Sequence, residues 1–152
     1  MPTHYDGKKL EIRSLDAYIK LMRASDAVTS RISLFETTNG LSTTQFGALE
    51  MIYHLGPLQQ NEIGKKLLVS KSNVVAVVDK LEYLGLVRRE RSSEDRRCVY
   101  VHLTEEGRNL IRDILPGHVA AITHEMSYLT EEELIELGRL CRKLGLGNET
   151  ES

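Results

Sequence analysis

The feature that most constrains the fold is the order of local structures between residues 58 and 103. Residues 59–67 are predicted to form a helix, residues 68–70 a short turn, and residues 71–84 a second helix. Two arms, residues 86–90 and 98–103, then flank a polar tip, and the second arm alternates apolar and polar side chains as a half-buried strand does. Two helices joined by a tight turn and followed by a hairpin are typical of a winged helix-turn-helix.

The second helix is predicted to bury one face and present the other. At about 100° per residue, aliphatic side chains gather on one side of it and a mixed row gathers on the opposite side. The aliphatic row is Val74, Val77, Val78, Leu81 and Leu84, and the mixed row is Ser72, Val75, Ala76 and Asp79. In the preceding helix, the small Gly64 lies where a second helix can cross closely. The helix pair therefore leaves one helical face for a partner.

The rest of the chain is predicted to be mainly helical. Residues 8–37 carry apolar side chains at helical spacing and form one or two helices. Capping signals at Ser42, Thr104 and Thr130 each open a helix, and Pro116 either kinks the helix after Thr104 or ends its first half. The expected fold class is mainly α with a small β-hairpin wing.

Basic residues are concentrated in the same part of the chain. The 152 residues have a formal net charge of -2, which by itself indicates no nucleic-acid partner. Residues 65–97, however, hold nine basic and five acidic residues, whereas residues 98–152 hold five and ten. An anionic partner would therefore meet the middle of the chain, because the local field matters more than the total charge.

Several segments of this region resemble the DNA-binding core of the MarR family of bacterial transcriptional regulators. The resemblance rests on LSTTQF (residues 41–46), LQQNEI (58–63), VSKSNV (69–74), VDKLEYLGLVRR (78–89) and DRR (95–97), followed by Leu103, Thr104 and Gly107. It implies a single domain over residues 8–147, with a winged helix-turn-helix core at residues 41–104. It also implies N- and C-terminal dimerisation helices at residues 8–37 and 105–147.

The resemblance further implies what the protein binds. A homodimer of this kind places one recognition helix per subunit in the major groove of double-stranded DNA, over a pseudo-palindromic operator, and a wing near the minor groove. It also implies a crevice for a small-molecule effector, often an aromatic anion, whose residues the sequence does not single out. The apolar first and last helices agree with a dimer, although they could instead bury each other within one chain.

The recognition helix supplies the first group of candidate DNA-binding residues. Ser70 is expected to cap this helix, and its exposed start favours phosphate, while an amide there could instead read adenine. Apolar side chains along the presented face can contact thymine methyl groups, and DNA shape then contributes to sequence preference. The candidates are Ser70, Lys71, Ser72, Asn73, Val75, Ala76 and Lys80.

The hairpin supplies the second group. Arg97 occupies the arginine position of the family's Asp-x-Arg wing, where Asp95 would orient the guanidinium for the narrow groove. Arg88 and Arg89 serve phosphates or structure, and the alternative for the whole hairpin is a solvated strand with weak cross-strand ion pairs. The DNA-binding candidates here are Arg89, Arg91, Asp95, Arg96 and Arg97.

Other classes of function find no support in the sequence. There is no phosphate loop, nucleophile elbow or paired-carboxylate arrangement, so neither an enzyme nor a cofactor is expected. Five histidines and two cysteines lack metal-ligand spacing. Without a long apolar run or a secretory signal, a cytoplasmic protein is expected. The alternative function is a winged-helix module that binds protein, which the apolar Val75 and Ala76 would favour.

Overall fold

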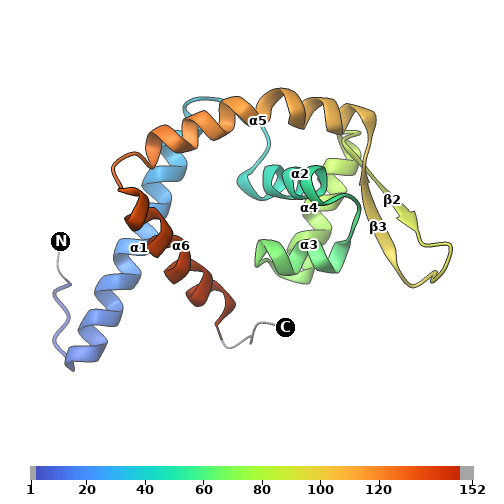
Figure 1. The fold of residues 1–152 in the computed structure, drawn as a ribbon. Coiled ribbons are helices and arrows are strands. Elements are labelled where there is room, and N and C mark those ends of the chain that lie inside the picture. The colour runs from blue at the N-terminus through green and yellow to red at the C-terminus, as the bar shows by residue number, and fades with distance from the viewer. Residues whose placement is uncertain (1–2, 148–152) are drawn as a thin grey trace. The chain divides into compact units, whose positions relative to one another are not determined.

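The computed structural model describes residues 3–147, and this range contains six helices and three strands (Figure 1). One compact unit ends at Glu36 and contains the first helix, and a second unit begins at Thr37 and contains the other elements. The mainly α fold with a hairpin wing is confirmed. In chain order, the elements are α1 (Lys9–Ser33), α2 (Thr43–Leu55), β1 (Leu58–Gln59), α3 (Gln60–Leu67), α4 (Lys71–Tyr83), β2 (Val87–Arg91), β3 (Val99–Leu103), α5 (Glu105–Glu125) and α6 (Glu131–Leu146).

The sheet has one strand more than the sequence indicated. The order is β1-β3-β2 and both pairings are antiparallel, with Leu58 opposite Val101 and Arg89 opposite the same residue on the other side. The predicted hairpin is present as β2 and β3, and β1 is a third strand that the sequence pattern did not indicate. A strand of two residues is too short to show a period of two, and it forms because its backbone meets the open edge of β3.

The core of the second unit confirms the two faces predicted for the recognition helix. Val74, Val77, Val78 and Leu81 of α4 are buried, and Val75 is exposed. Gly64 allows α3 to approach α4 closely, because a Cβ atom added there would lie 3.2 Å from Cγ1 of Val74. The other large side chains that are almost fully buried come from the surrounding elements: Leu49, Ile52, Ile63, Val87, Val101 and Ile111.

The helix boundaries follow the predicted caps. Hydroxyl oxygens of Ser42, Ser70, Thr104 and Thr130 each accept a backbone N–H from the residue three positions later. The two choices that the sequence left open are settled in favour of longer helices, since residues 8–37 give the single helix α1 and α5 continues through Pro116.

A tight joint connects the start of α5 to the base of the wing. The backbone N–H of Thr104 donates to the carbonyl of Leu86 at 3.1 Å, and the Thr104 hydroxyl donates to the carbonyl of Gly85 at 2.6 Å. A Cβ atom added at Gly107 would overlap the Leu86 carbonyl oxygen. Only glycine fits at position 107 without moving the backbone of one of the two elements.

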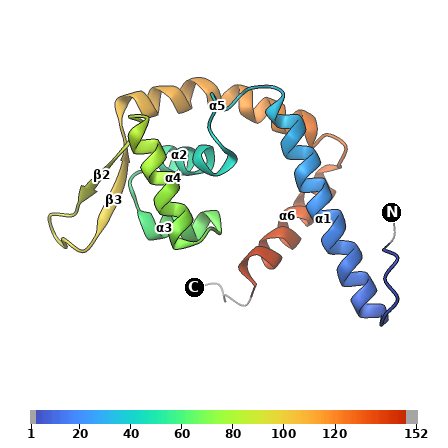
Figure 2. The same ribbon diagram turned by 180° about the vertical axis from the view of Figure 1, so that it is seen from behind.

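Further along its length, α5 passes α2 (Figure 2), and His118 of α5 connects the two helices. The ring of His118 lies 4.3 Å from that of Phe46, and its Nδ1 is 2.8 Å from the Thr37 hydroxyl oxygen. Burial lowers the pKa of His118, because desolvation penalises the charged imidazolium. A neutral ring therefore packs between α5 and α2 at neutral pH.

The first and last helices both carry exposed apolar side chains. Neither α1 nor α6 contains a buried residue. In α6, Leu134, Leu137, Leu140 and Leu144 follow helical spacing and are all exposed. No helix within residues 3–147 combines the length and apolar character that a membrane span requires.

Gly107→Ala tests the joint between α5 and the wing. We expect it to lower the free energy of unfolding by about 2 to 3 kcal/mol, because the methyl group has to displace the Leu86 carbonyl. Gly117→Ala in the same helix is the control: apart from its chain neighbours and its own helix backbone, no atom lies within 4 Å of its added Cβ, so it should stabilise by about 0.5 to 1 kcal/mol. Denaturant unfolding at matched protein concentration measures both, and similar effects of the two variants would contradict the joint.

Candidate nucleic-acid interface

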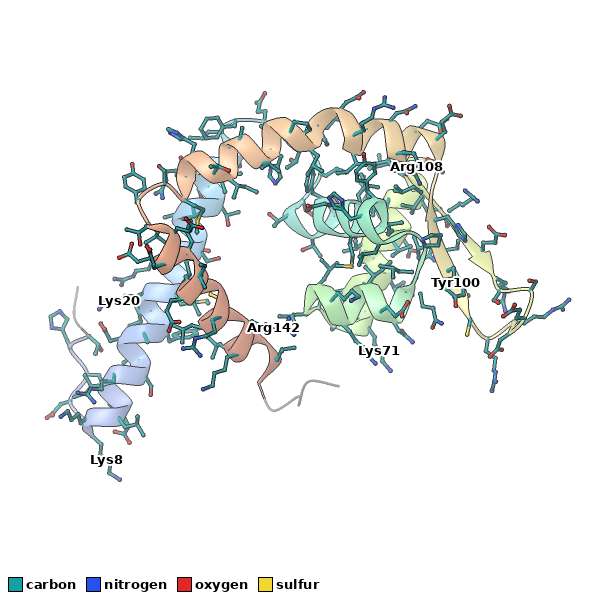
Figure 3. The ribbon with its side chains drawn as sticks, in the orientation of Figure 1. Lys8, Lys20, Lys71, Tyr100, Arg108 and Arg142 are labelled. Carbon is teal, nitrogen blue, oxygen red and sulfur yellow. The ribbon has the colours of Figure 1, made fainter. Side chains whose placement is uncertain are left out.

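The start of α4 is polar and exposed. Ser70 Oγ accepts the N–H of Asn73 at 3.2 Å and lies 3.2 Å from Oγ of Ser72, which confirms the predicted cap. Lys71, Ser72 and Asn73 are exposed in the first turn of the helix (Figure 3 labels Lys71). The positive end of the helix dipole and a lysine thus meet at one place, which suits an anionic ligand.

The middle of the presented face is less polar. The side chain of Val75 keeps 40% of its surface exposed, and Ala76 is exposed beside it. Val75 lies about one helical turn after Ser72 and Asp79 about two turns after it, so both continue the same row. Lys80 lies beside this row, with its Nζ 5.5 Å from the ring centroid of Tyr83. The face therefore offers apolar contact at its centre and charges at its ends.

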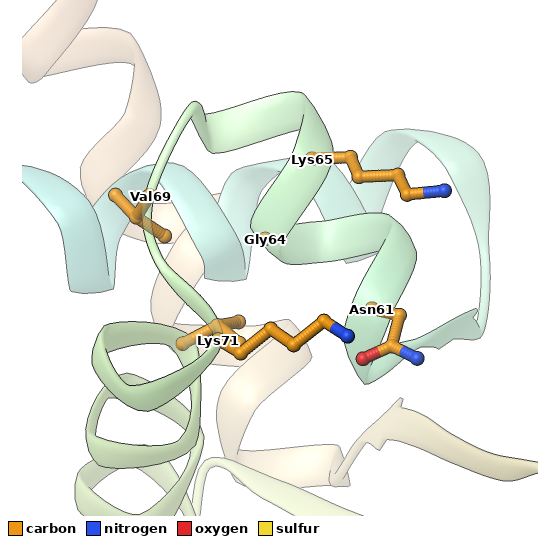
Figure 4. Close-up of a pocket in the computed structure, with 6 residues that line it drawn as sticks. Asn61, Gly64, Lys65, Val69 and Lys71 are labelled. Carbon is orange, nitrogen blue, oxygen red and sulfur yellow. The ribbon is translucent and has the colours of Figure 1, made fainter.

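A shallow notch separates the start of α4 from α3 (Figure 4). It has a volume of about 180 Å³, and Figure 4 shows the Lys71 side chain extending along it toward Asn61. Lys65 also lines the notch and is absent from the residues predicted from sequence. The signal that could have found it is its position one helical turn after Asn61 in α3.

The tip of the wing holds the predicted Asp-x-Arg pair. Asp95 Oδ1 accepts the Nε–H of Arg97 at 3.2 Å and its backbone N–H at 3.0 Å, and Oδ2 accepts from Nη2 at 3.3 Å. These bonds lower the pKa of Asp95, with the side-chain bond to Arg97 as the largest cause. The Arg97 side chain nevertheless stays 91% exposed. Its guanidinium is therefore held in one orientation by Asp95 and is still accessible to a ligand.

The remaining arginines of the tip differ in how they are held. Arg91 donates from Nη1 to the carbonyl of Arg96 at 3.1 Å, and this bond braces the loop between β2 and β3. Ser92 Oγ accepts the backbone N–H of Asp95 at 3.3 Å, and Arg96 itself is exposed. The hairpin tip thus has its own internal hydrogen bonds, with Arg96 and Arg97 directed outward.

Arg89 has a different environment from the other predicted contacts. Its side chain is 25% exposed, and its guanidinium binds Asp79 and Glu82 of α4 and the amide oxygen of Gln60 in α3. The structure therefore brings together the residues of the α4 start and, separately, those of the wing tip, while Arg89 lies between α4 and the sheet. Sequence reasoning missed the Gln60 contact, because 29 residues separate the two partners.

Comparison with known proteins gives a consistent family. The MarR family profile matches residues 41–99. The chain is 36% identical over 134 residues to the HTH-type transcriptional regulator MhqR of Bacillus subtilis, covering 88% of this chain and 92% of that protein. It is 31% identical over 112 residues to the HTH-type transcriptional repressor MdtR of the same species, covering 74% and 72%.

Solved structures share the fold. Sco3205, a MarR family transcriptional regulator from Streptomyces coelicolor solved in complex with DNA, matches with a TM-score of 0.81 at 24% identity, over 97% of this chain and 93% of that one. CouR from Rhodococcus jostii RHA1, solved bound to p-coumaroyl-CoA, matches with a TM-score of 0.77 at 23% identity, over 91% and 97%. At these identities the likeness concerns the fold.

Proposed function

The chain belongs to the MarR family of transcriptional regulators, and we propose that it is a homodimeric repressor whose single domain spans residues 8–147. In this proposal, α4 enters the major groove of an operator and the wing follows the neighbouring minor groove. The observation that carries the proposal is the Asp95–Arg97 pair, which holds an exposed guanidinium in a set orientation at the wing tip. An arginine prepared in this way suits the negative potential of a narrow minor groove.

The proposed contacts divide into two chemical classes. Lys71, Ser72 and Asn73, capped by Ser70, face phosphates at the start of α4, and Lys80 meets the backbone further along the helix. Val75 and Ala76 contact thymine methyl groups rather than hydrogen-bonding base edges. Arg91 and Arg96 support Arg97 at the wing. Sequence preference in this arrangement depends on few direct base contacts and on the shape of the duplex.

The proposed dimer rests on the uncovered apolar faces. α6 contains no buried residue although four of its leucines lie at helical spacing. Large apolar faces on a water-soluble chain mark an interaction surface, and a second copy supplies a complementary one through two-fold symmetry. Two copies also explain a pseudo-palindromic operator, since each subunit would meet one half-site.

Leu140→Glu tests the dimer. Because Leu140 is 48% exposed within its own chain, the charge should be tolerated by the isolated subunit but should separate the dimer. We expect sedimentation at micromolar concentration to change from dimer to monomer, and Glu132→Lys, at an exposed position on another side of α6, to leave the dimer intact. A monomer for the unmodified protein would contradict the architecture.

A small-molecule effector, with an aromatic anion as the class favoured by the family, completes the proposal. The solved structure of CouR with p-coumaroyl-CoA supports the idea that this fold accommodates an anionic aromatic ligand. Release of DNA on effector binding requires that the ligand bind the DNA-free conformation more tightly. Because the proposed partner is DNA, the proposal also places the protein in the compartment that contains it, the cytoplasm of a bacterial cell.

The experiment that tests the proposed function selects bound fragments from the source genome and measures their salt dependence. We expect half-sites about 10 base pairs apart, and log affinity that falls against log salt with a slope of roughly -0.9 per phosphate contact. A second candidate function, a protein-binding module, is favoured by the exposed apolar Val75 and Ala76. If no fragment binds above background at low salt, the protein-binding function replaces the proposal.

The wing assignment predicts that DNA affinity and stability respond separately. Arg97→Ala should change the free energy of unfolding by no more than about 0.5 kcal/mol, because the side chain is 91% exposed. It should weaken operator binding by about 1 to 3 kcal/mol per subunit.

Asp95→Ala gives the diagnostic sign. This variant removes a negative charge near DNA, yet it should weaken binding, because Arg97 loses the three bonds from its side chain and backbone that orient it. Titrating labelled operator with both single variants and the double variant measures the coupling. Tighter binding by Asp95→Ala, together with no effect of Arg97→Ala, would show that the wing assignment is wrong.

A further inference from the structure

Arg89 joins three elements through a single guanidinium. Nη2 donates to Asp79 Oδ1 at 2.6 Å, Nη1 donates to Glu82 Oε1 at 3.1 Å, and Nε and Nη2 donate to Gln60 Oε1 at 3.1 and 3.0 Å. The backbone N–H of Arg89 also donates to Glu82 Oε2 at 2.9 Å. Strand β2 is thereby bound to the second half of α4 and to the first residue of α3.

The donors of this arginine are largely occupied inside the protein. A guanidinium has five N–H groups, and four hydrogen bonds from them end on Asp79, Glu82 and Gln60. A phosphate could reach Arg89 only through the one remaining donor or by breaking this set. The neighbouring Arg88 is different: it is 55% exposed and binds the carbonyl of Leu103 and Glu90 on the hairpin itself.

The position of these contacts complements the apolar packing of α4. Near its start, α4 packs closely on α3 through the apolar contact of Val74 with Gly64. At its second half, Asp79 and Glu82 are the residues that Arg89 holds. The helix is therefore fixed at two places along its length, one apolar and one ionic, and both fix it relative to α3.

Asp79 adds an electrostatic consequence. It is 60% exposed and continues the row of Ser72 and Val75 on the presented face of α4. A bare carboxylate on this face would repel DNA phosphates, since both are negative. The guanidinium 2.6 Å away offsets that charge where it faces the partner.

We propose that Arg89 is a positioning residue rather than a DNA ligand: it sets the angle of α4 against α3 and the wing, and it masks the charge of Asp79. This inference rests on the proposed DNA-binding function for its effect on affinity. It replaces the sequence-based assignment of Arg89 as a phosphate contact and gives β2 a role in presenting the recognition helix.

Two substitutions separate a positioning residue from a phosphate ligand. Arg89→Lys keeps the charge, and lysine is a good phosphate binder, but one ammonium cannot bridge Gln60, Asp79 and Glu82 together. We expect it to weaken operator binding by roughly tenfold, close to Arg89→Ala, with the salt slope of the unmodified protein retained. Gln60→Ala removes no charge but removes the amide oxygen that accepts from Arg89, so it should also weaken operator binding. Arg88→Ala, on the same strand, is the matched control and should change affinity by less than about threefold.

A measurement on the free protein keeps the test independent of DNA. In Arg89→Ala, Arg89→Lys and Gln60→Ala, the amides of the second half of α4 should exchange faster with solvent hydrogen than in Arg88→Ala. Faster exchange with no operator binding by the unmodified protein would uphold the positioning role and reject the proposed function. Unchanged exchange in these variants would overturn the inference. It would also be overturned if Arg89→Lys bound the operator as tightly as the unmodified protein while Arg89→Ala made the slope of log affinity against log salt less steep by about 0.9 per subunit.

Discussion

Four aliphatic side chains of α4 are buried against neighbouring elements, and their burial determines which face of the helix is presented to the outside. Val74, Val77, Val78 and Leu81 are each at most 9% exposed, so the helix cannot rotate about its axis without bringing apolar surface into water. The row of Ser72, Val75 and Asp79 is outward because the other side is fixed inward. A close crossing at Gly64 then determines how near α3 can come, and the notch beside Lys71 is what remains between the two helices.

The arginines show how one residue type acquires different roles from its surroundings. Arg97 has a single carboxylate partner and stays 91% exposed, which leaves its outer face for a ligand. Arg89 has two carboxylates and an amide around it and is 25% exposed. Arg91 donates to a backbone carbonyl and braces a loop. Their roles follow from the partners that the fold brings to each guanidinium, because the side chain carries the same charge in all three.

Much of the fold could be predicted from local signals. Hydroxyl caps and helical spacing placed α2, α4, α5 and α6, since these signals act between residues a few positions apart. β1 could not be predicted, because a strand of two residues depends on the edge of β3, about 40 residues later in the chain. The contact of Arg89 with Gln60 could not be predicted for the same reason, because the two residues are 29 positions apart. Asp95 and Arg97 were predictable as a pair because they are separated by one residue.

The joint at Thr104 has a mechanical consequence. The start of α5 is bound to Gly85 and Leu86, which immediately precede β2, and Gly107 presses directly against the Leu86 backbone. A contact this close has no compressible side chain in it, so a tilt of α5 carries the root of the hairpin with it. Because the tip of the hairpin lies farther from this joint than its base does, a small rotation of α5 about the joint would move Arg97 at the tip by a larger distance.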